Sequence, residues 1–156
     1  MPEPKLDKLD RDILSVLQTD ARISLQELSK RVGLSSSPCW TRIRRMEESG
    51  VIEGYTVRVN AQALNLAETV IVQVTLDSHS DEALFAFGRA LADIPEVLEA
   101  LLVSGDYDYI LRIAVSDTRD YERLLRERLY KIPGLRHSKS SFVLRSLKQS
   151  PLPLHR

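Results

Sequence analysis

The chain of 156 residues has little of several residue types on which common functions depend. It contains one cysteine, Cys39, so it can form no intrachain disulfide and cannot build a zinc site from cysteine pairs. Its three histidines, His79, His137 and His155, lie far apart in the sequence and lack the spacing of metal ligands. We therefore expect neither a disulfide framework nor a metal site.

Long apolar runs are also missing. The longest uncharged apolar stretch, around residues 69 to 76, is far shorter than the roughly 18 residues that a membrane span requires. The first residues, MPEPKLDKLDRD, are charged and lack the apolar region of a secretory signal. We therefore expect a reduced, cytoplasmic location and no association with a membrane.

Neither sign of charge is in excess, since 22 Lys and Arg residues balance 22 Asp and Glu residues. This balance excludes a wholly basic nucleic-acid coat and an acidic tail protein, but it says nothing about local basic patches. With 43% apolar and 28% charged residues, the composition is that of an ordinary globular protein and argues against disorder. The length suits one domain of ordinary size or two small ones.

The start of the chain has the pattern of short helices. Apolar residues recur at steps of three and four from Leu6 to Leu17, and Asp7 is a suitable N-cap for this first helix. Ser24 and Glu27 match a capping box at the start of a second helix. Two consecutive helices are therefore predicted here.

A third helix is expected to end at Gly50. Ser37 is placed to act as its N-cap, and Pro38 fits the first helical position, where its missing amide hydrogen costs nothing. A helix turns by about 100° per residue, which gathers some apolar side chains on one side. Those expected to face the core are Cys39, Ile43 and Met46.

From residue 51 onward, alternating apolar residues indicate strands. The expected elements are a connecting strand at 51–59, strands at 70–76, 97–103 and 107–115, helices at 81–92 and 118–131, and a last strand within 135–148. After the connecting strand the order is βαββαβ, as in ferredoxin-like domains. We therefore predict an α+β chain with a helix-turn-helix domain over 1–50, a connecting strand and linker over 51–66, and a ferredoxin-like domain over 67–156.

Basic residues cluster in the second and third expected helices. From Leu28 to Met46 there are five basic residues and no acidic one, and we call this stretch the basic window. A basic helix face that follows a tight turn suits a DNA-binding helix-turn-helix, although a merely solvated surface is the alternative. The residues expected to read bases are Ser36, Ser37, Trp40, Thr41 and Arg44, and those expected to contact phosphates are Lys30, Arg31, Arg42 and Arg45.

Five basic residues per subunit are few for tight binding to DNA. If about four of them met phosphates, the logarithm of affinity would fall against the logarithm of salt concentration with a slope of roughly −3 to −4. We therefore expect double-stranded DNA to be bound by a dimer that reads half-sites on one face of the duplex, with avidity beyond the dimer.

Several runs of sequence resemble the Lrp/AsnC (feast/famine) family of transcription regulators. They are Leu9–Leu14, Ile23–Ser35, Pro38–Glu47, Gly50–Tyr55, Val103–Tyr109 and Pro133–Leu135. They stand in the family's order through nearly the whole chain. The resemblance implies a winged-helix-like DNA-binding domain and a βαββαβ effector domain (RAM domain), whose sheets pair into homodimers that assemble further, commonly into octamers.

The resemblance also implies a small effector, usually an amino acid, bound between dimers near the hairpin that contains Gly105. The corresponding effector positions are Ser104, Gly105, Asp106, Tyr107, Asp108, Ser138 and Ser140. Relatives often have threonines at the two last positions, so the side-chain preference of the pocket stays open. Asp106 or Asp108 could accept from an ammonium, and hydroxyls or turn amides could donate to a carboxylate, although Gly-Asp is also ordinary turn chemistry.

Other classes of function have less support in the sequence. There is no Ser/His/Asp arrangement in a supporting motif and no Gly-rich phosphate loop, so we expect no enzyme and no cofactor. A protein-interaction adaptor with a ferredoxin-like dimerisation domain is the alternative. RNA binding is disfavoured because the strands lack the exposed aromatic pattern that stacks bases. We expect a sequence-specific DNA-binding transcription regulator whose assembly and DNA binding respond to an amino acid or a related metabolite.

Overall fold

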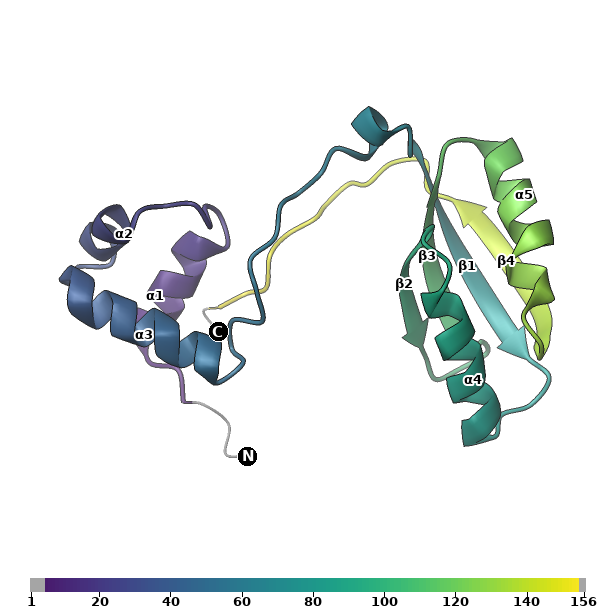
Figure 1. Cartoon of the computed structure of the whole chain (residues 1–156), viewed down its shortest axis with the longest axis horizontal. Coiled ribbons are helices and arrows are strands. Elements are labelled where there is room, and N and C mark those ends of the chain that lie inside the picture. Colours follow the sequence, from purple (N-terminus) through teal and green to yellow (C-terminus); the bar gives the residue numbers. More distant parts are fainter. Residues whose placement is uncertain (1–4, 155–156) are drawn as a thin grey trace. The chain divides into compact units, whose positions relative to one another are not determined.

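The structure, a computed structural model, describes residues 5–154 (Figure 1). The chain divides into two compact units. The helical unit contains the residues up to Arg58 together with those from Lys148 onward, and the sheet unit runs from Val59 to Leu147. The domain ranges expected from the sequence stay a prediction, and the contacts add that the last part of the chain packs with the helices. Within residues 5–154, no helix has both the length and the apolar character that crossing a membrane demands.

Three helices form the first part of the helical unit, and two of them begin where the sequence predicts. They are α1 (Lys8–Leu17), α2 (Leu25–Arg31) and α3 (Ser36–Glu48). The Asp10 N–H donates to Asp7 Oδ1 at 2.9 Å and the Asp7 N–H donates to Asp10 Oδ2 at 3.1 Å, which closes a capping box on α1. Ser24 Oγ accepts from the Glu27 N–H at 3.1 Å, which confirms the Ser24 half of the capping box expected for α2. The Glu27 carboxylate instead accepts from Arg31 Nε.

The start of α3 differs from the prediction. Ser35, and not Ser37, is the N-cap residue, and its side chain makes no capping hydrogen bond. Pro38 therefore lies at the third helical position. This position tolerates proline because the first amides of a helix have no intrahelical acceptor. The end agrees with the sequence, since Gly50 follows the C-cap residue with a φ of 73°.

The helical unit has a small core that includes a residue from the end of the chain. Its buried members are Ile13, Leu14, Leu28, Cys39 and Met46. Leu154 packs against this core, and Arg11 Nη1 donates to the Leu154 carbonyl at 2.7 Å. Burial raises the pKa of the Cys39 thiol, in keeping with a structural residue. The tail is thus part of the helical unit.

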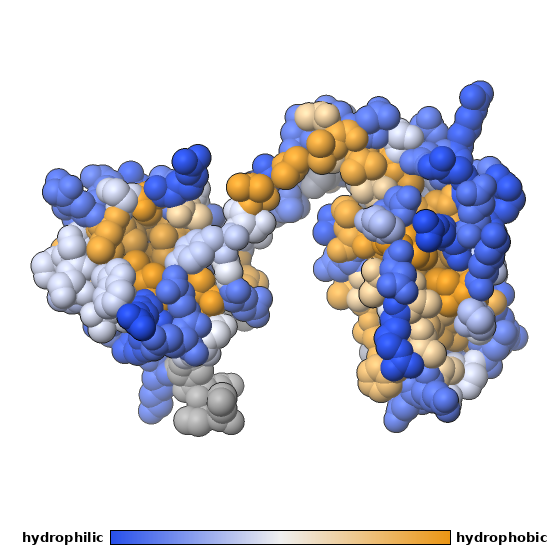
Figure 2. All heavy atoms as spheres, in the orientation of Figure 1, coloured by the Kyte–Doolittle hydropathy of each residue, from blue (hydrophilic) through white to orange (hydrophobic). Residues whose placement is uncertain are grey.

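The expected strand over residues 51–59 does not form in the single chain. The stretch is irregular, and a short 3₁₀ helix, η1 (Ala61–Leu64), follows it. A strand needs a neighbour for its backbone hydrogen bonds, and β-branched residues alone do not supply one. Val57 and Val59 are 77% and 62% exposed, so apolar surface on the connecting segment faces solvent (Figure 2).

The sheet unit confirms the ferredoxin-like order. Its elements are β1 (Glu68–Leu76), α4 (Asp81–Ala92), β2 (Val97–Leu102), β3 (Tyr109–Val115), α5 (Thr118–Glu127), the 3₁₀ helix η2 (Leu129–Lys131) and β4 (Leu135–Phe142). The strands lie in the order β2-β3-β1-β4, and every neighbouring pair is antiparallel. This is the arrangement of a split βαβ fold.

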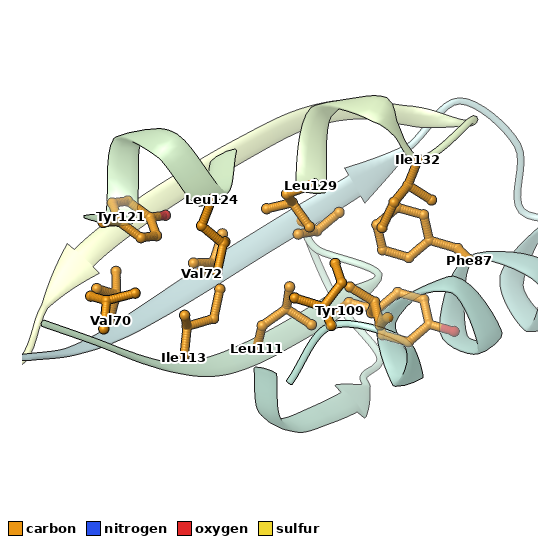
Figure 3. Packing of buried hydrophobic residues seen from close by; sticks show 14 of the residues in the cluster. Val70, Val72, Phe87, Tyr109, Leu111, Ile113, Tyr121, Leu124, Leu129 and Ile132 are labelled. Atoms are coloured by element: carbon orange, nitrogen blue, oxygen red, sulfur yellow. The ribbon is translucent and has the colours of Figure 1, made fainter. Parts of the chain in front are cut away.

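One face of the sheet carries the core of the sheet unit. Val70, Val72 and Val74 alternate along β1 and are fully buried. Figure 3 shows Val70 and Val72 facing Tyr121 and Leu124 of α5. In the described part of the chain, the opposite face of the sheet is not covered by helices. On that face Leu101 of β2 pairs with Ile110 of β3 and is 47% exposed. We call this second side the open face of the sheet.

Candidate DNA-binding and effector sites

The turn between α2 and α3 is closed by hydrogen bonds. The Leu34 N–H donates to the Ser29 carbonyl at 2.8 Å, and the hydroxyls of Ser29 and Ser36 lie 3.4 Å apart. Gly33 in this turn has a φ of 71°, a left-handed conformation that glycine adopts without strain. The turn therefore fixes α3 against α2 as a helix-turn-helix requires.

The residues predicted to contact DNA come together on α2 and α3. The exposed ones are Lys30, Arg31, Ser37, Trp40, Thr41, Arg44 and Arg45, and the half-buried ones are Ser36 and Arg42. Cys39 and Met46 lie on the buried side of α3, as the helical projection predicts. Thr41 Oγ1 donates to the Ser37 carbonyl at 3.1 Å, which ties this hydroxyl to its own helix.

The arginines of the basic window are paired with acids from outside it. Arg31 Nε lies 3.3 Å from Glu27, and Arg44 Nε lies 2.7 Å from Glu48. Both pairs are exposed, so they contribute little stability and can be exchanged for other partners. The guanidinium of Arg44 also stands 5.2 Å from the ring centre of Trp40.

A stronger set of ion pairs joins α3 to the start of α1. Arg42 Nη1 binds Asp7 Oδ2 at 2.7 Å and Asp10 Oδ1 at 2.8 Å, while Arg45 Nη2 binds Asp10 Oδ2 at 2.6 Å. The Asp10 N–H and then Arg42 lower the pKa of the Asp7 carboxyl. The hydrogen bonds that Arg42 donates to Asp10 and Asp7 raise the pKa of Arg42. The sequence did not single out Asp10 as a partner, although it lies one turn before Ile13 on the buried stripe of α1.

A hollow of about 470 Å³ lies beside α3 in the helical unit. Trp40 lines it and is half exposed, so the indole lies at the edge of the core. Tyr55 also lines it and donates its hydroxyl to Glu47 Oε1 at 2.8 Å. Burial, with a contribution from this hydrogen bond, raises the pKa of Tyr55 to about 12.

The predicted effector hairpin forms between β2 and β3. Gly105 has a φ of 123°, which a residue with a side chain rarely adopts. The Val103 N–H donates to the Asp108 carbonyl at 3.0 Å, and the Asp108 N–H donates to the Val74 carbonyl at 2.9 Å. Ser104 and Asp106 are exposed at the tip, and Tyr107 is half-buried. The hairpin is thus held to the end of β1.

The carboxylate of Asp108 already has partners in the single chain. Its Oδ2 accepts from the Leu76 N–H at 2.7 Å, and its Oδ1 lies 3.1 Å from His79 Nε2. Asp106 is the more exposed of the two acids on the hairpin. Of these two carboxylates, that of Asp108 is therefore the one held within the sheet unit, and that of Asp106 is the one at the surface.

Ser138 and Ser140 lie on the helix-covered face of the sheet, where they stand opposite Val74 and Val72 of β1. Ser140 shares a hydrogen bond of 2.5 Å with the Tyr121 hydroxyl. Ser138 Oγ donates to the Tyr130 hydroxyl at 3.4 Å. Strand β1 separates them from β3 and its hairpin, a spacing of about 10 Å across two strand intervals. The two tyrosine partners were missed because sequence periodicity assigns a face and no contact.

Comparisons with known proteins match both units. Residues 69–153 match the Lrp/AsnC ligand binding domain, and residues 6–53 match a winged helix-turn-helix DNA-binding domain. The leucine-responsive regulatory proteins of Escherichia coli K12 and Salmonella typhimurium are each 43% identical over 149 residues, which is 96% of this chain and 91% of theirs.

Solved structures agree over the same length. A transcriptional regulator of Neisseria meningitidis in complex with L-Met has a TM-score of 0.91 at 32% identity. An AsnC family transcriptional regulator of Agrobacterium tumefaciens has a TM-score of 0.90 at 39% identity. Each similarity covers 96% of this chain and 97% of the other. The chain therefore belongs to the Lrp/AsnC family and is a DNA-binding transcription regulator with a ligand-binding domain.

Proposed function

We propose that this regulator binds operator DNA through α3 and the turn before it. The residues assigned to bases are Ser36, Ser37, Trp40, Thr41 and Arg44, and those assigned to phosphates are Lys30, Arg31, Arg42 and Arg45. Within this second group, Arg45 is favoured over Arg42, because Arg45 is 57% exposed and Arg42 is 24% exposed and bound to two carboxylates. The helix-turn-helix match and the exposed basic side chains of α3 support this assignment.

We propose further that the effector is an amino acid. The observation that carries this proposal is the match of the sheet unit to a ligand-binding domain, together with the L-Met complex of the Neisseria regulator. The residues assigned to the effector are Ser104, Gly105, Asp106, Tyr107, Asp108, Ser138 and Ser140. The hairpin and the two serines lie on different strands with β1 between them. We propose that the pocket forms between subunits, as the family resemblance implies.

The assembly proposed for the regulator is a homodimer that associates further, up to an octamer, with its action in the cytoplasm on double-stranded DNA. The open face of the sheet supports pairing of two copies, because Ile71, Leu101 and Ile110 lie on it. An effector bound between dimers shifts the distribution of assemblies, since it binds one state more tightly. The number and spacing of DNA-binding units change with that distribution.

Thermal unfolding across the twenty amino acids tests the effector. A ligand present at about 100 times its Kd adds roughly 2.7 kcal/mol to the free energy of unfolding. We expect a selective rise that Asp106→Asn removes. Glu122→Gln is the matched control, because Glu122 is an exposed acid on α5, away from the hairpin and from the open face, and loses its charge in the same way. A flat response to all twenty amino acids contradicts the proposal.

DNA binding is tested with a duplex that the unaltered chain selects from random sequence. Arg44→Ala is expected to lower affinity by about tenfold, as for loss of a charged hydrogen bond. Arg126→Ala is the control, because Arg126 forms a similar exposed ion pair with Glu122 in the sheet unit. Undiminished affinity of the Arg44 variant, with its fold intact, contradicts the assignment of that residue to the DNA surface.

A further inference from the structure

Asp10 is a charged residue with no exposed side-chain surface, inside the unit that binds DNA. Its Oδ1 accepts from Arg42, and its Oδ2 accepts from Arg45 and from the Asp7 N–H. Burying a carboxylate is costly unless it is paired and hydrogen-bonded, and here both oxygens are satisfied. A buried acid that is paired with two arginines of the basic window calls for a functional explanation.

The two arginines that bind Asp10 differ in what they leave available. Arg42 donates from a single nitrogen, Nη1, to both Asp7 and Asp10, and most of its side chain is buried. Arg45 gives Nη2 to Asp10, and 57% of its side chain stays exposed. A guanidinium has five N–H donors, so Arg45 can hold Asp10 and a second anion at the same time. One side of the Arg45 guanidinium is therefore fixed by Asp10, while its remaining N–H groups can bind another anion.

We propose that Asp10 is a positioning residue for DNA binding, which orients Arg45 of α3 toward a DNA phosphate. The inference rests on the proposed assignment of Arg45 to phosphate. A free arginine loses rotamer freedom when it binds, and an arginine already held by a buried carboxylate loses less of it. Asp10 also completes the capping box of α1 by accepting from the Asp7 N–H, so the same side chain ties the start of that helix to α3.

Arg44 and Glu48 provide a matched comparison on the same helix. They too form an ion pair, at 2.7 Å, but both side chains are more than half exposed. Glu48 is exposed, so it does not hold Arg44 in a fixed orientation as a buried carboxylate would. It also competes with phosphate for Arg44. Removing Glu48 is therefore expected to leave affinity for DNA unchanged or slightly higher, whereas removing the charge of Asp10 is expected to lower it.

A double-mutant cycle tests the proposal with the full chain and the duplex described above. The variants are Asp10→Asn, Arg45→Ala and their combination, with Glu48→Gln, Arg44→Ala and their combination as the control cycle. Affinity is measured by fluorescence anisotropy over a range of salt concentrations, and folding is checked through Trp40, the single tryptophan of the chain.

Arg45→Ala is expected to weaken binding by about tenfold and to reduce the salt slope by about one. Asp10→Asn is expected to weaken binding several-fold, and the combined variant to bind no more weakly than Arg45→Ala alone. If the losses of DNA-binding free energy from Asp10→Asn and Arg45→Ala add in the combined variant, Asp10 acts independently of Arg45, through the fold. That result would overturn the proposal. No effect of Arg45→Ala overturns the phosphate assignment itself, which separates the two failures.

Arg45→Lys keeps the proposal testable if Asp10→Asn does not fold. Lysine preserves the charge, so the salt slope should not change. Its single ammonium lacks the planar fork that can bind Asp10 and a phosphate together, so affinity should fall several-fold. Full affinity with Arg45→Lys overturns the proposal.

Discussion

Gly88 in α4 offers a sharp test of how the β2–β3 hairpin, the proposed effector site, is anchored. A Cβ on Gly88 would lie 3.0 Å from the hydroxyl of Tyr109, the first residue of β3 after the hairpin. That hydroxyl donates to the Leu84 carbonyl at 2.7 Å. The Tyr109 ring is buried and lies 5.4 Å from the ring of Phe87, so it has little room to move.

Two opposing effects decide what Gly88→Ala does. In the interior of a helix, alanine in place of glycine normally stabilises by about 0.5–1 kcal/mol. Forcing a methyl group against a well-packed neighbour costs about 1–3 kcal/mol. Because Tyr109 is held from several sides, we expect the contact to win and the free energy of unfolding to fall by about 1 kcal/mol.

Removing the hydroxyl should reverse the sign. Tyr109→Phe loses one hydrogen bond, at a cost of about 0.5–1.5 kcal/mol, and opens space next to Gly88. In that background Gly88→Ala should stabilise by about 0.5–1 kcal/mol. The two substitutions should therefore show a coupling of about 1.5–2 kcal/mol, as contacting residues do.

Denaturant unfolding followed by far-UV circular dichroism measures the four proteins of this cycle. Ala86→Gly provides the intrinsic preference at an exposed position of the same helix and should cost about 0.5–1 kcal/mol. Stabilisation by Gly88→Ala in the presence of Tyr109, equal to that in the Tyr109→Phe background, would refute the reasoning.

Three further outcomes are expected. Tyr55 titrates near pH 10 when unfolded and near 12 when folded, so the stability due to its raised pKa should be complete below pH 10 and lost between 10 and 12. Unfolding followed through Trp40 should show this loss, and Tyr55→Phe should remove it. Leu101→Asp places a charge on the open face and should lower the mass seen by sedimentation velocity, whereas an unchanged mass argues against that face as the dimer contact. Leu129→Ala, at a fully buried position, should cost about 2–5 kcal/mol in denaturant unfolding, and a smaller loss would mean that the core closes over the gap.

Local signals in the sequence predicted most of the helical unit. Asp7 and Ser24 could be predicted as caps from residue type and position, because a cap bonds an amide only three residues further along the chain. The start of α3 was misplaced because Ser35, Ser36 and Ser37 are equally suitable caps, and because proline is tolerated at several positions of a first turn.

Contacts over long sequence separations could not be predicted from the pattern. Arg45 and Asp10 are 35 residues apart, and no periodicity connects them. The predicted strand over 51–59 failed for a related reason, since its residues favour β-structure but the single chain offers them no neighbouring strand. The two serines of the predicted effector site were placed on the expected strand, whereas their tyrosine partners, Tyr121 and Tyr130, became visible only in three dimensions.

The contact of Leu154 with the helical core has a consequence for how the protein is made. The three helices leave the ribosome first, but their core lacks Leu154, and Arg11 lacks its carbonyl partner, until translation has passed the whole sheet unit. A nascent chain can therefore form the helix-turn-helix early and complete its packing only after Leu154 has been added. A message that is cut short after the sheet unit would yield a DNA-binding unit with an incomplete core.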